Sequence, residues 1–357
     1  MKHKLTISLI VGILLSAAGF YLAFRNVPAK EIIHYFARIN YFWLMPAFIL
    51  VILSFILRVF RWQIILAPTK KIDFWSGFHP VMVAFAINCI LPGRVGELAR
   101  PAILKQREKI RFSTGLATIA LERAFDISLI IGLFLITYPW IEFDPNMTMQ
   151  VGSTSLDQGT LETIVRGMFK LGIVLIMGML LVSFEWSRRH MIRFIQKSPN
   201  LLFFLSAPSR DRIRHTLCSP LVRMLDNFAS GFATIQSPSR ILICLMLSIL
   251  IWLIMALSYY VFSLGSPGVA ISFPEMVAVM VIICIFIALP SVPGYWGIWE
   301  AGGILAMVAF GVSQTDAAGF TLANHALQVL PVVLLGFISA LVTGINMLHT
   351  PTNTDQD

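Results

Sequence analysis

Residues 88–100 read NCILPGRVGELAR, and residues 289–300 read LPSVPGYWGIWE. Each stretch ends an apolar run, and each carries the pattern Pro-Gly-x-x-Gly followed within a helical turn by a glutamate. Proline and glycine interrupt helices, and an interruption frees backbone N–H and C=O groups. In lipid such a break persists only where protein or water satisfies those groups. The two stretches therefore predict paired helix breaks around a polar site.

The composition places these breaks in a membrane protein. Of the 357 residues, 57% are hydrophobic and only 13% are charged, whereas about a quarter of the residues in a soluble domain are charged. The apolar runs are continuous and do not alternate with polar residues, which favours spanning helices over a barrel. The sequence predicts an all-α polytopic membrane protein with about six spanning helices and two re-entrant broken hairpins.

Long apolar runs give the expected positions of the spans, since a helix needs about 20 apolar residues to cross a bilayer. The runs are 5–24, 41–67, 113–138, 168–184, 241–264 and 318–348. Two shorter apolar segments, 77–91 and 273–289, lead into the breaks. The first run is long enough to be a retained helix and not a cleaved signal peptide.

Basic residues set the expected orientation, because Lys and Arg concentrate in cytoplasmic loops. Both flanks of the first broken segment are basic, so we expect a hairpin that enters from the cytoplasm and turns at Pro92-Gly93. The alternative, in which every apolar segment crosses fully, stays open. Both termini are expected in the cytoplasm, as is the basic segment 187–240. That segment is either an ordinary loop or partly an interfacial helix.

The predicted elements form an inverted repeat. A span, a broken hairpin and a span occupy 41–138, and the same order occupies 241–348 with the opposite starting side. Inverted repeats with discontinuous helices point to a transporter's binding site. We expect a single transmembrane domain over 1–350 and a polar tail over 351–357.

Polar residues beside the breaks are the candidate substrate-binding residues. A charge at mid-membrane costs on the order of 3 kcal/mol and usually marks function. A helix that begins after a break points its positive end at the site and attracts anions. The candidates are Asn88, Pro92, Gly93, Arg94, Gly96, Glu97, Arg100, Glu122, Arg123, Asp126, Pro293, Gly294, Gly297, Glu300, Asn324 and Gln328.

Helical spacing predicts some contacts among the charged candidates. Glu97 and Arg100 are three positions apart and could pair on one helix face. Glu122 and Asp126 are four apart and should also share a face. The alternative is that the charges at 122 and 123 mark a cytoplasmic helix end and reach out to water.

Other polar residues are given structural interpretations. Arg58 and Arg61 are expected to be topology anchors at the end of a span. Asn324 and Gln328 share a face and, with His325, either donate to a substrate or bond between helices. The aromatic residues at 295–299 either belong to the site or form an interfacial belt.

Several classes of function lack a signature in the sequence. There is no zinc-protease motif, nucleophile elbow or nucleotide-binding loop, and the seven histidines and four cysteines have no metal-ligand spacing. We therefore expect no catalytic residue, no metal and no cofactor. The net charge of +9 lies in loops between apolar segments, as expected of a protein facing anionic lipid and not nucleic acid.

Three motifs together resemble the transmembrane region of lysylphosphatidylglycerol synthases. They are N-x-x-L-P-G-R-x-G-E-x-x-R at 88–100, L-E-R-x-x-D at 121–126 and P-G-x-x-G-x-x-E at 293–300. In fused members of that family this region is held to flip a modified phospholipid that a separate soluble domain makes. The resemblance covers most of the chain and implies a stand-alone, flippase-like member without the aminoacyl-transferase domain.

The leading hypothesis is a lipid flippase or transporter in a bacterial inner membrane. Its substrate would be a phosphate-bearing phospholipid, glycolipid or polyprenyl-linked lipid with an anionic headgroup. Arg94, Arg100 and Arg123 would bind the phosphate. A second copy of the chain or a lipid-synthesis enzyme is an expected partner, and the basic residues between 188 and 240 could serve as its docking surface.

The acidic candidates could have either of two roles, as carriers of a coupling proton or as a general base in an enzyme. Glu97, Asp126 or Glu300 could carry a proton during transport. The rival hypothesis is a membrane-embedded transferase acting on a lipid-linked substrate, with Glu97 or Glu300 as general base.

Overall fold

The computed structural model of the chain describes residues 13–91 apart from 15, 22 and 26, and also 95–137, 148–151, 154–157, 185–201, 213–219, 237–288 and 293–345, with isolated positions elsewhere between 139 and 222. Pro92, Gly93 and Arg94 lie outside the described residues, as do the tail at 351–357 and most of the predicted span 168–184.

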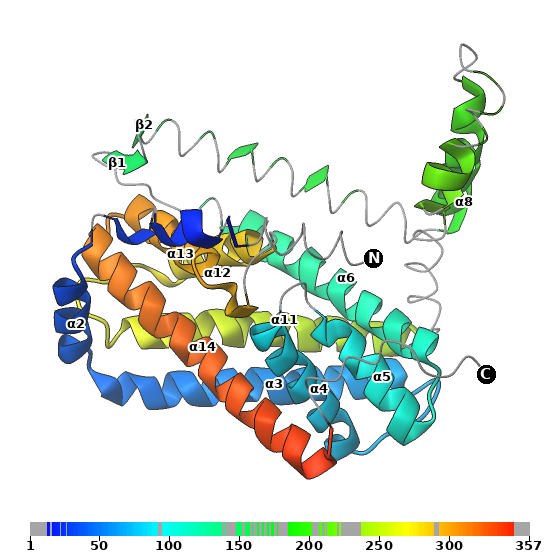
Figure 1. Cartoon of the computed structure of the whole chain (residues 1–357), viewed down its shortest axis with the longest axis horizontal. Helices are drawn as coiled ribbons and strands as arrows, with labels where there is room; N and C mark the ends of the chain where they lie inside the picture. Colours follow the sequence, from blue (N-terminus) through cyan, green and yellow to red (C-terminus); the bar gives the residue numbers. More distant parts are fainter. Residues whose placement is uncertain are drawn as a thin grey trace.

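Helices make up the fold (Figure 1). They are α2 (Ala29–Arg38), α3 (Leu44–Leu66), α4 (Phe74–Ile90), α5 (Gly96–Glu108), α6 (Phe112–Thr137), α8 (Glu185–Leu201), α11 (Pro238–Ser263), α12 (Phe273–Ile287), α13 (Ile298–Ala309) and α14 (Gln314–Thr343). Short helical turns are η1 (Tyr41–Trp43), η4 (Arg214–Cys218) and η5 (Pro293–Tyr295). One short antiparallel strand pair, β1 (Thr148–Val151) and β2 (Thr154–Asp157), accompanies the helices. The predicted all-α class is confirmed by the helical body.

Three described helices are long and apolar enough to cross a bilayer: η1 with α3, α11, and α14. Together with α6 they coincide with four of the predicted spans to within a few residues. Helix α6 is 26 residues long but carries Glu122, Arg123 and Asp126 in its middle. The chain is therefore an α-helical membrane protein in which one long helix holds several charges.

Local capping determines where the shorter helices begin. The carboxylate of Asp73 accepts from the N–H groups of Trp75 and Ser76 and starts α4. Ser272 and Glu275 form a capping box that starts α12. Such caps satisfy N–H groups that would otherwise lack partners at a helix start.

Helices α4 and α5 pack against each other as a hairpin. The ammonium of Lys70, just before α4, donates to Glu108 Oε2 at 2.7 Å and to its backbone oxygen at 3.0 Å. This hydrogen bond lowers the pKa of Glu108 below its usual value. Both ends of the hairpin therefore lie together. With 17 residues, α4 is about 25 Å long, shorter than a hydrocarbon core of about 30 Å.

Helices α12 and α13 form the second hairpin. The chain entering it and the chain leaving it meet at Gly268, where an added Cβ would touch the carboxylate of Asp316. Both predicted broken segments are thus helical hairpins whose two ends lie together. That they are re-entrant in a bilayer stays a prediction.

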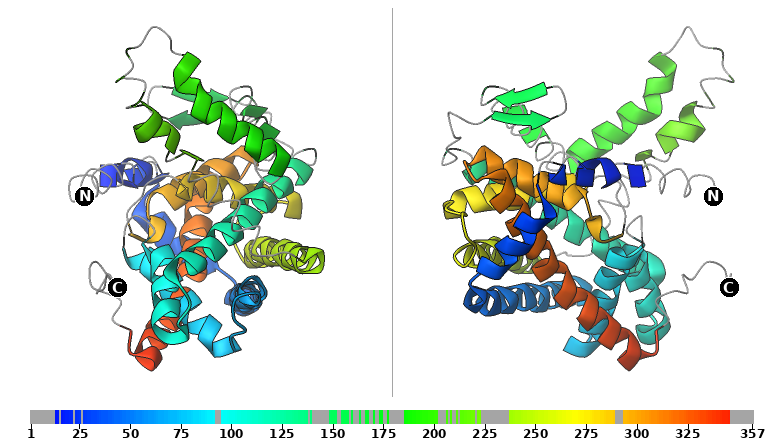
Figure 2. Two further views of the ribbon diagram at one scale, coloured as in Figure 1. Left: turned by 90° about the vertical axis from the view of Figure 1, so that its right-hand side faces the viewer. Right: turned by 60° about the vertical axis from the view of Figure 1, so that its left-hand side comes forward.

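The two repeats exchange neighbours. Helix α3 runs antiparallel to α11, with the N–H of Asn40 donating to the Gly265 oxygen at 2.8 Å. Helix α4 of the first repeat packs on α14 of the second, and α12 of the second packs on α6 of the first. Helix α14 crosses the helical body from the α12–α13 hairpin to the α4–α5 hairpin (Figures 1 and 2). The inverted repeat itself stays a prediction.

Close contact between α14 and α4 depends on Gly336. A Cβ built there would overlap Ala86 Cβ and approach the backbone oxygen of Met82 at 2.8 Å. At Gly132 in α6, by contrast, a Cβ would meet nothing within 4 Å. Glycine is costly in a helix unless close packing requires it.

The same substitution should have opposite effects at these two positions. Gly336→Ala should lower the free energy of unfolding by about 1–3 kcal/mol because the added methyl group overpacks the contact. Gly132→Ala should raise it by up to about 1 kcal/mol through helix propensity alone. Thermal unfolding in detergent measures both, and equal stability of the two variants would contradict the packing of α4 on α14.

Candidate functional site

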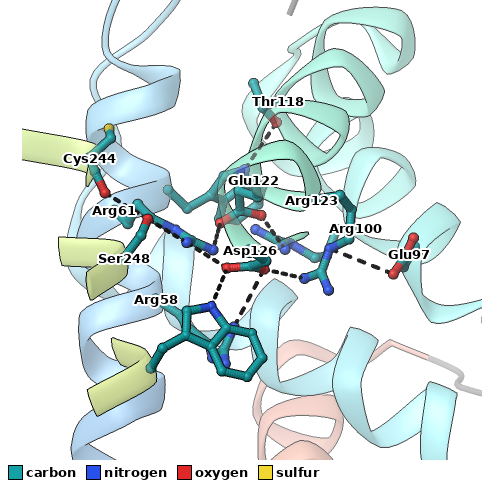
Figure 3. A network of polar contacts seen from close by, with 12 residues as sticks. Arg58, Arg61, Glu97, Arg100, Thr118, Glu122, Arg123, Asp126, Cys244 and Ser248 are labelled. Atoms are coloured by element: carbon teal, nitrogen blue, oxygen red, sulfur yellow. Dashed lines mark hydrogen bonds and ion pairs between the residues drawn. The ribbon is translucent and has the colours of Figure 1, made fainter. Parts of the chain in front are cut away.

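Five charged side chains meet between apolar helices: Arg58 and Arg61 from α3, Arg100 from α5, and Glu122 and Asp126 from α6 (Figure 3). Their exposed fractions are 7%, 1%, 4%, 1% and 2% in that order. Burying charges is costly unless they are paired. We call these five residues, with Glu97 and Arg123, the charge cluster.

Direct contacts join four helices at the centre of the charge cluster. Arg61 Nη1 donates to Asp126 Oδ1 at 2.7 Å and to Ser248 Oγ of α11 at 2.7 Å. Arg61 Nη2 lies 3.8 Å from Glu122 Oε1. Arg100 Nη1 of α5 lies 2.7 Å from Glu122 Oε2. The carboxylates of α6 thereby connect α3, α5 and α11.

Arg58 is held mainly by aromatic rings. Its Nη1 lies 3.7 Å from Asp126 Oδ2. The guanidinium carbon lies 5.5 Å from the ring of Trp252 and 5.8 Å from the rings of Phe55 and Phe85. Trp252 also donates through Nε1 to Asp126 Oδ1 at 3.2 Å. Cation–π contacts stabilise a desolvated guanidinium but offer it no hydrogen-bond acceptor.

One edge of the charge cluster is accessible. The side chains of Arg123 and Glu97 are 32% and 31% exposed, and Arg123 Nε lies 3.8 Å from Glu97 Oε1. Arg123 Nη2 lies 3.3 Å from Asp126 Oδ2, so this edge connects to the buried centre. A ligand approaching the charge cluster would meet Arg123 and Glu97 first.

The charge cluster contains more positive than negative groups. Within the described chain its four arginines face three carboxylates, which leaves one excess positive charge. Several buried guanidinium nitrogens also have no hydrogen-bond acceptor: Nε of Arg58, Nε of Arg61, and both Nε and Nη2 of Arg100. An anion with several oxygens, such as a phosphate, would supply both the missing charge and the missing acceptors.

The tips of the two hairpins touch. Asn88 Oδ1 accepts from the N–H of Gly96 at 2.8 Å and bridges the first break. The backbone oxygen of Cys89 lies 3.4 Å from the position of a Cβ on Gly294. Gly294 and Gly297 have φ of +72° and +85°, a backbone conformation that glycine adopts without strain. Two of the glycines of the second motif are thus required by its turn.

A second polar group lies at the second tip. Glu300 Oε2 accepts from the N–H of Gly297 at 2.7 Å. Glu300 Oε1 lies 2.5 Å from Nδ1 of His325 on α14, and His325 Nε2 donates to the Gly294 oxygen at 2.8 Å. Both side chains are fully buried. We call Glu300 and His325 the acid–histidine pair.

Aromatic rings enclose the acid–histidine pair. The His325 ring stacks on Trp299, with centroids 4.5 Å apart and planes 4° apart, and it contacts Trp296 at 4.5 Å. Trp299 is only 6% exposed, so the interfacial-belt alternative fails for this residue. Trp296 is 42% exposed and forms the outer wall.

The spacing argument gave some correct contacts. Glu122 and Asp126 both face the charge cluster, as predicted. Gln328 Nε2 donates to Asn324 Oδ1 at 3.4 Å, which confirms their shared face, and also to Ser258 of α11 at 3.0 Å. The bond to Ser258 agrees with the interhelical alternative.

Other expectations were wrong. Arg58 and Arg61 are buried ion-pair partners and not topology anchors, because α6 supplies carboxylates at their depth. Glu97 and Arg100 do not pair with each other, since Arg100 points inward to Glu122. Glu122 does not reach out to water.

The pairing of Glu300 with His325 was missed. The two residues are 25 positions apart on different helices, so no helical spacing signals it. In the described chain no group of three or more His, Cys, Asp or Glu residues could hold a metal ion.

Comparison with known proteins adds two findings. Residues 9–336 match the family model described as "Lysylphosphatidylglycerol synthase TM region". A stretch of 130 residues, 36% of this chain, is 26% identical to "Glycosyltransferase AglD" of Haloferax volcanii and covers 20% of that protein. The chain therefore spans about a fifth of the length of this curated relative.

Ion pairing in the charge cluster should be measurable as stability. Glu122→Gln leaves the buried guanidinium group of Arg100 without its carboxylate and removes the longer contact of Arg61, so it should cost about 3–5 kcal/mol of unfolding free energy. Glu97→Gln, at the exposed edge, should cost no more than about 1 kcal/mol. Denaturant unfolding in detergent measures both. The double variant Arg100→Gln/Glu122→Gln should be less destabilised than the sum of the single changes, and additivity would contradict the pairing.

Proposed function

This chain belongs to the lysylphosphatidylglycerol synthase TM region family, and from that premise we propose that it moves a phosphate-bearing lipid between the leaflets of a bacterial inner membrane. The substrate is a phospholipid, a glycolipid or a polyprenyl-linked lipid with an anionic headgroup. The observation that carries the proposal is the charge cluster, a buried group of arginines with one excess positive charge in the interior of an apolar helical protein.

The headgroup enters at the accessible edge. Arg123 is one-third exposed and is joined through Asp126 to the buried arginines, so a phosphate can contact Arg123 before it displaces a carboxylate. Arg100 then offers two nitrogens that have no acceptor within the described chain. Arg94, which follows the first break in sequence, is the further cation assigned to this site. The lipid tails stay outside, against the apolar helix faces.

Other candidates in the described chain lie near the two hairpin tips. Asn88 and Gly96 hold the first tip together. Pro293 begins η5, and Asn324 and Gln328 lie on α14 beside the second tip. We assign these residues to the wall of the path of the headgroup.

The topology proposed for the bilayer follows the charge pattern. Residues 1–350 form one transmembrane domain with both termini in the cytoplasm. The α4–α5 hairpin enters from the cytoplasmic side, where Lys70 and Glu108 meet, and the α12–α13 hairpin enters from the opposite side. Touching tips then close the path at mid-membrane, and movement of one hairpin against the other exposes the site to one leaflet at a time.

A transferase is the second candidate, and the similarity to a protein named a glycosyltransferase favours it. Glu97 is the carboxylate of the charge cluster with access to its surroundings, and it would act as general base on a lipid-linked substrate. Mass spectrometry of the lipid separates the two functions. A transferase changes the mass of the lipid, whereas a flippase changes only its leaflet.

Translocation should depend on Arg123. In proteoliposomes that contain a fluorescent phosphatidylglycerol, Arg123→Gln should slow movement between leaflets about 10- to 100-fold, the equivalent of one charge-assisted hydrogen bond of about 1.5–3 kcal/mol. Arg111→Gln removes an exposed arginine just before α6 and should leave the rate unchanged. Chemical quenching of the outer-leaflet fluorescence measures the rate.

The zwitterionic lipid phosphatidylcholine, carrying the same label, serves as the comparison substrate. It should move more slowly than phosphatidylglycerol in the wild-type protein, because it cannot neutralise the excess positive charge. Equal rates for both lipids, or an Arg123→Gln variant as fast as Arg111→Gln, would remove the charge cluster from the proposed path.

A further inference from the structure

The acid–histidine pair differs from the other buried carboxylates of the described chain in the chemistry of its partner. Glu122 and Asp126 face guanidinium groups, which do not lose their proton in proteins. Glu300 faces His325, and a carboxyl group and an imidazole can each hold a proton or accept a hydrogen bond without one. The acid–histidine pair is therefore built from two groups that can pass a proton between them, which a guanidinium partner cannot do.

The hydrogen bonds fix how many protons the pair holds. The Gly294 oxygen can only accept, so Nε2 of His325 carries a hydrogen. The 2.5 Å separation of Nδ1 from Glu300 Oε1 requires one further hydrogen between them, since two bare acceptors would repel. Glu300 Oε2 already accepts from the Gly297 N–H. One exchangeable proton thus lies between Oε1 and Nδ1.

We propose that Glu300 and His325 bind the proton whose movement down its gradient drives lipid translocation. The inference rests on the proposed flippase function and deepens it by naming the coupling ion. It also selects among the acidic candidates, because Asp126 is bound to Arg61 and Glu97 is paired at the exposed edge. No redox step or co-reactant is needed, since one proton is taken up from one side and released to the other.

The geometry connects this proton to the opening of the path. With the proton present, His325 holds α14 to Glu300 at the start of α13 and to the Gly294 oxygen in the tip. When the proton leaves, Oε1 and Nδ1 face each other as bare acceptors, and α14 separates from the tip. The tip that is released is the one that contacts Cys89 of the first hairpin. The proton therefore controls the contact that closes the path.

In the described part of the chain, neighbouring elements contribute no fixed charge to the pair. From α11 the Tyr259 phenol approaches through its stacking on Trp299, and from α12 the Cys284 thiol lies in the same core. From α4 the chain approaches through the backbone oxygen of Cys89. Phenol and thiol groups are neutral at physiological pH. Within the described chain no Lys or Arg forms an ion pair with Glu300.

Among the residues that the structure describes, the remaining walls around the pair are also uncharged. Gly297 is covered by the backbone of the N-terminal helical residues Ser16 and Gly19, α6 adds apolar side chains to the core, and Trp296 covers His325 on the exposed side. The charge of the pair therefore depends on its own proton.

The test uses the full chain in vesicles of phosphatidylcholine and phosphatidylglycerol, with fluorescent phosphatidylglycerol as the probe. A gradient of about one pH unit, coupled to one proton per lipid, should shift the steady-state ratio of probe between leaflets by up to about tenfold in the wild-type protein. Glu300→Gln keeps an acceptor for the Gly297 N–H but cannot exchange a proton. Its leaflet ratio should be the same with and without the gradient.

Glu275→Gln is the matched control. Glu275 is also the third residue of its helix and accepts from the N-cap N–H, of Ser272, at 2.6 Å, but it faces no histidine in the described chain. This variant should keep the full gradient response. If both variants lose the response, helix capping and not proton binding explains the role of Glu300, and a Glu300→Gln variant that keeps the response overturns the proposal directly.

The outcomes separate the two proposals. A wild-type protein that equilibrates the probe without responding to the gradient overturns the proton inference and leaves the flippase function standing. A wild-type protein that moves no probe under any gradient overturns the function itself. Should Glu300→Gln fail to fold, two other measurements test the proposal. His325→Gln should lose the response to the gradient. A pH-sensitive dye inside vesicles that contain the wild-type protein should report proton entry only when lipid moves, and proton entry without lipid movement would contradict coupling.

Discussion

The structure depends on the ion pairs that α6 makes at its middle. A helix with two buried carboxylates cannot remain among apolar neighbours unless cations reach it, and Arg61 and Arg100 do so from α3 and α5. Because breaking such a pair costs several kcal/mol, these contacts fix the depth and the rotation of three helices relative to one another. Ser248 on α11 receives the remaining hydrogen bond of Arg61, so the second repeat is held to the same centre.

The charge cluster and the acid–histidine pair are two buried polar groups with different chemistry. The charge cluster is rich in charged groups and is the proposed site of an anionic headgroup, whereas Glu300 and His325 share the hydrogen bond that we propose holds the coupling proton. Both lie beside a hairpin break, and the two tips touch where Cys89 meets Gly294. Binding at one tip can therefore influence the other through direct contact. Helix α14 adds a second connection, since it contacts the α4–α5 hairpin through Gly336 and the α12–α13 hairpin through His325.

Membership of the lysylphosphatidylglycerol synthase TM region family agrees with this division. Under the proposed function, the transmembrane region needs a polar interior that a lipid headgroup can reach, and the exposed edge at Arg123 and Glu97 is the proposed entry. The relative named a glycosyltransferase shares a stretch equal to a fifth of its own length. The similarity therefore concerns this shared stretch and does not extend to the activity of the whole relative.

The sequence by itself determined the elements. Long apolar runs must be helices in lipid because every backbone group needs a partner, and the repeated Pro-Gly-x-x-Gly motif located both hairpins. It also identified Glu122 and Asp126 as one face, since helical spacing is a local property. Only the tertiary structure decided which charges meet. Arg61 comes from a helix far away in sequence, and Glu300 meets His325 across two helices. Such contacts depend on the angles and positions at which helices cross, and these cannot be predicted from local spacing in one sequence.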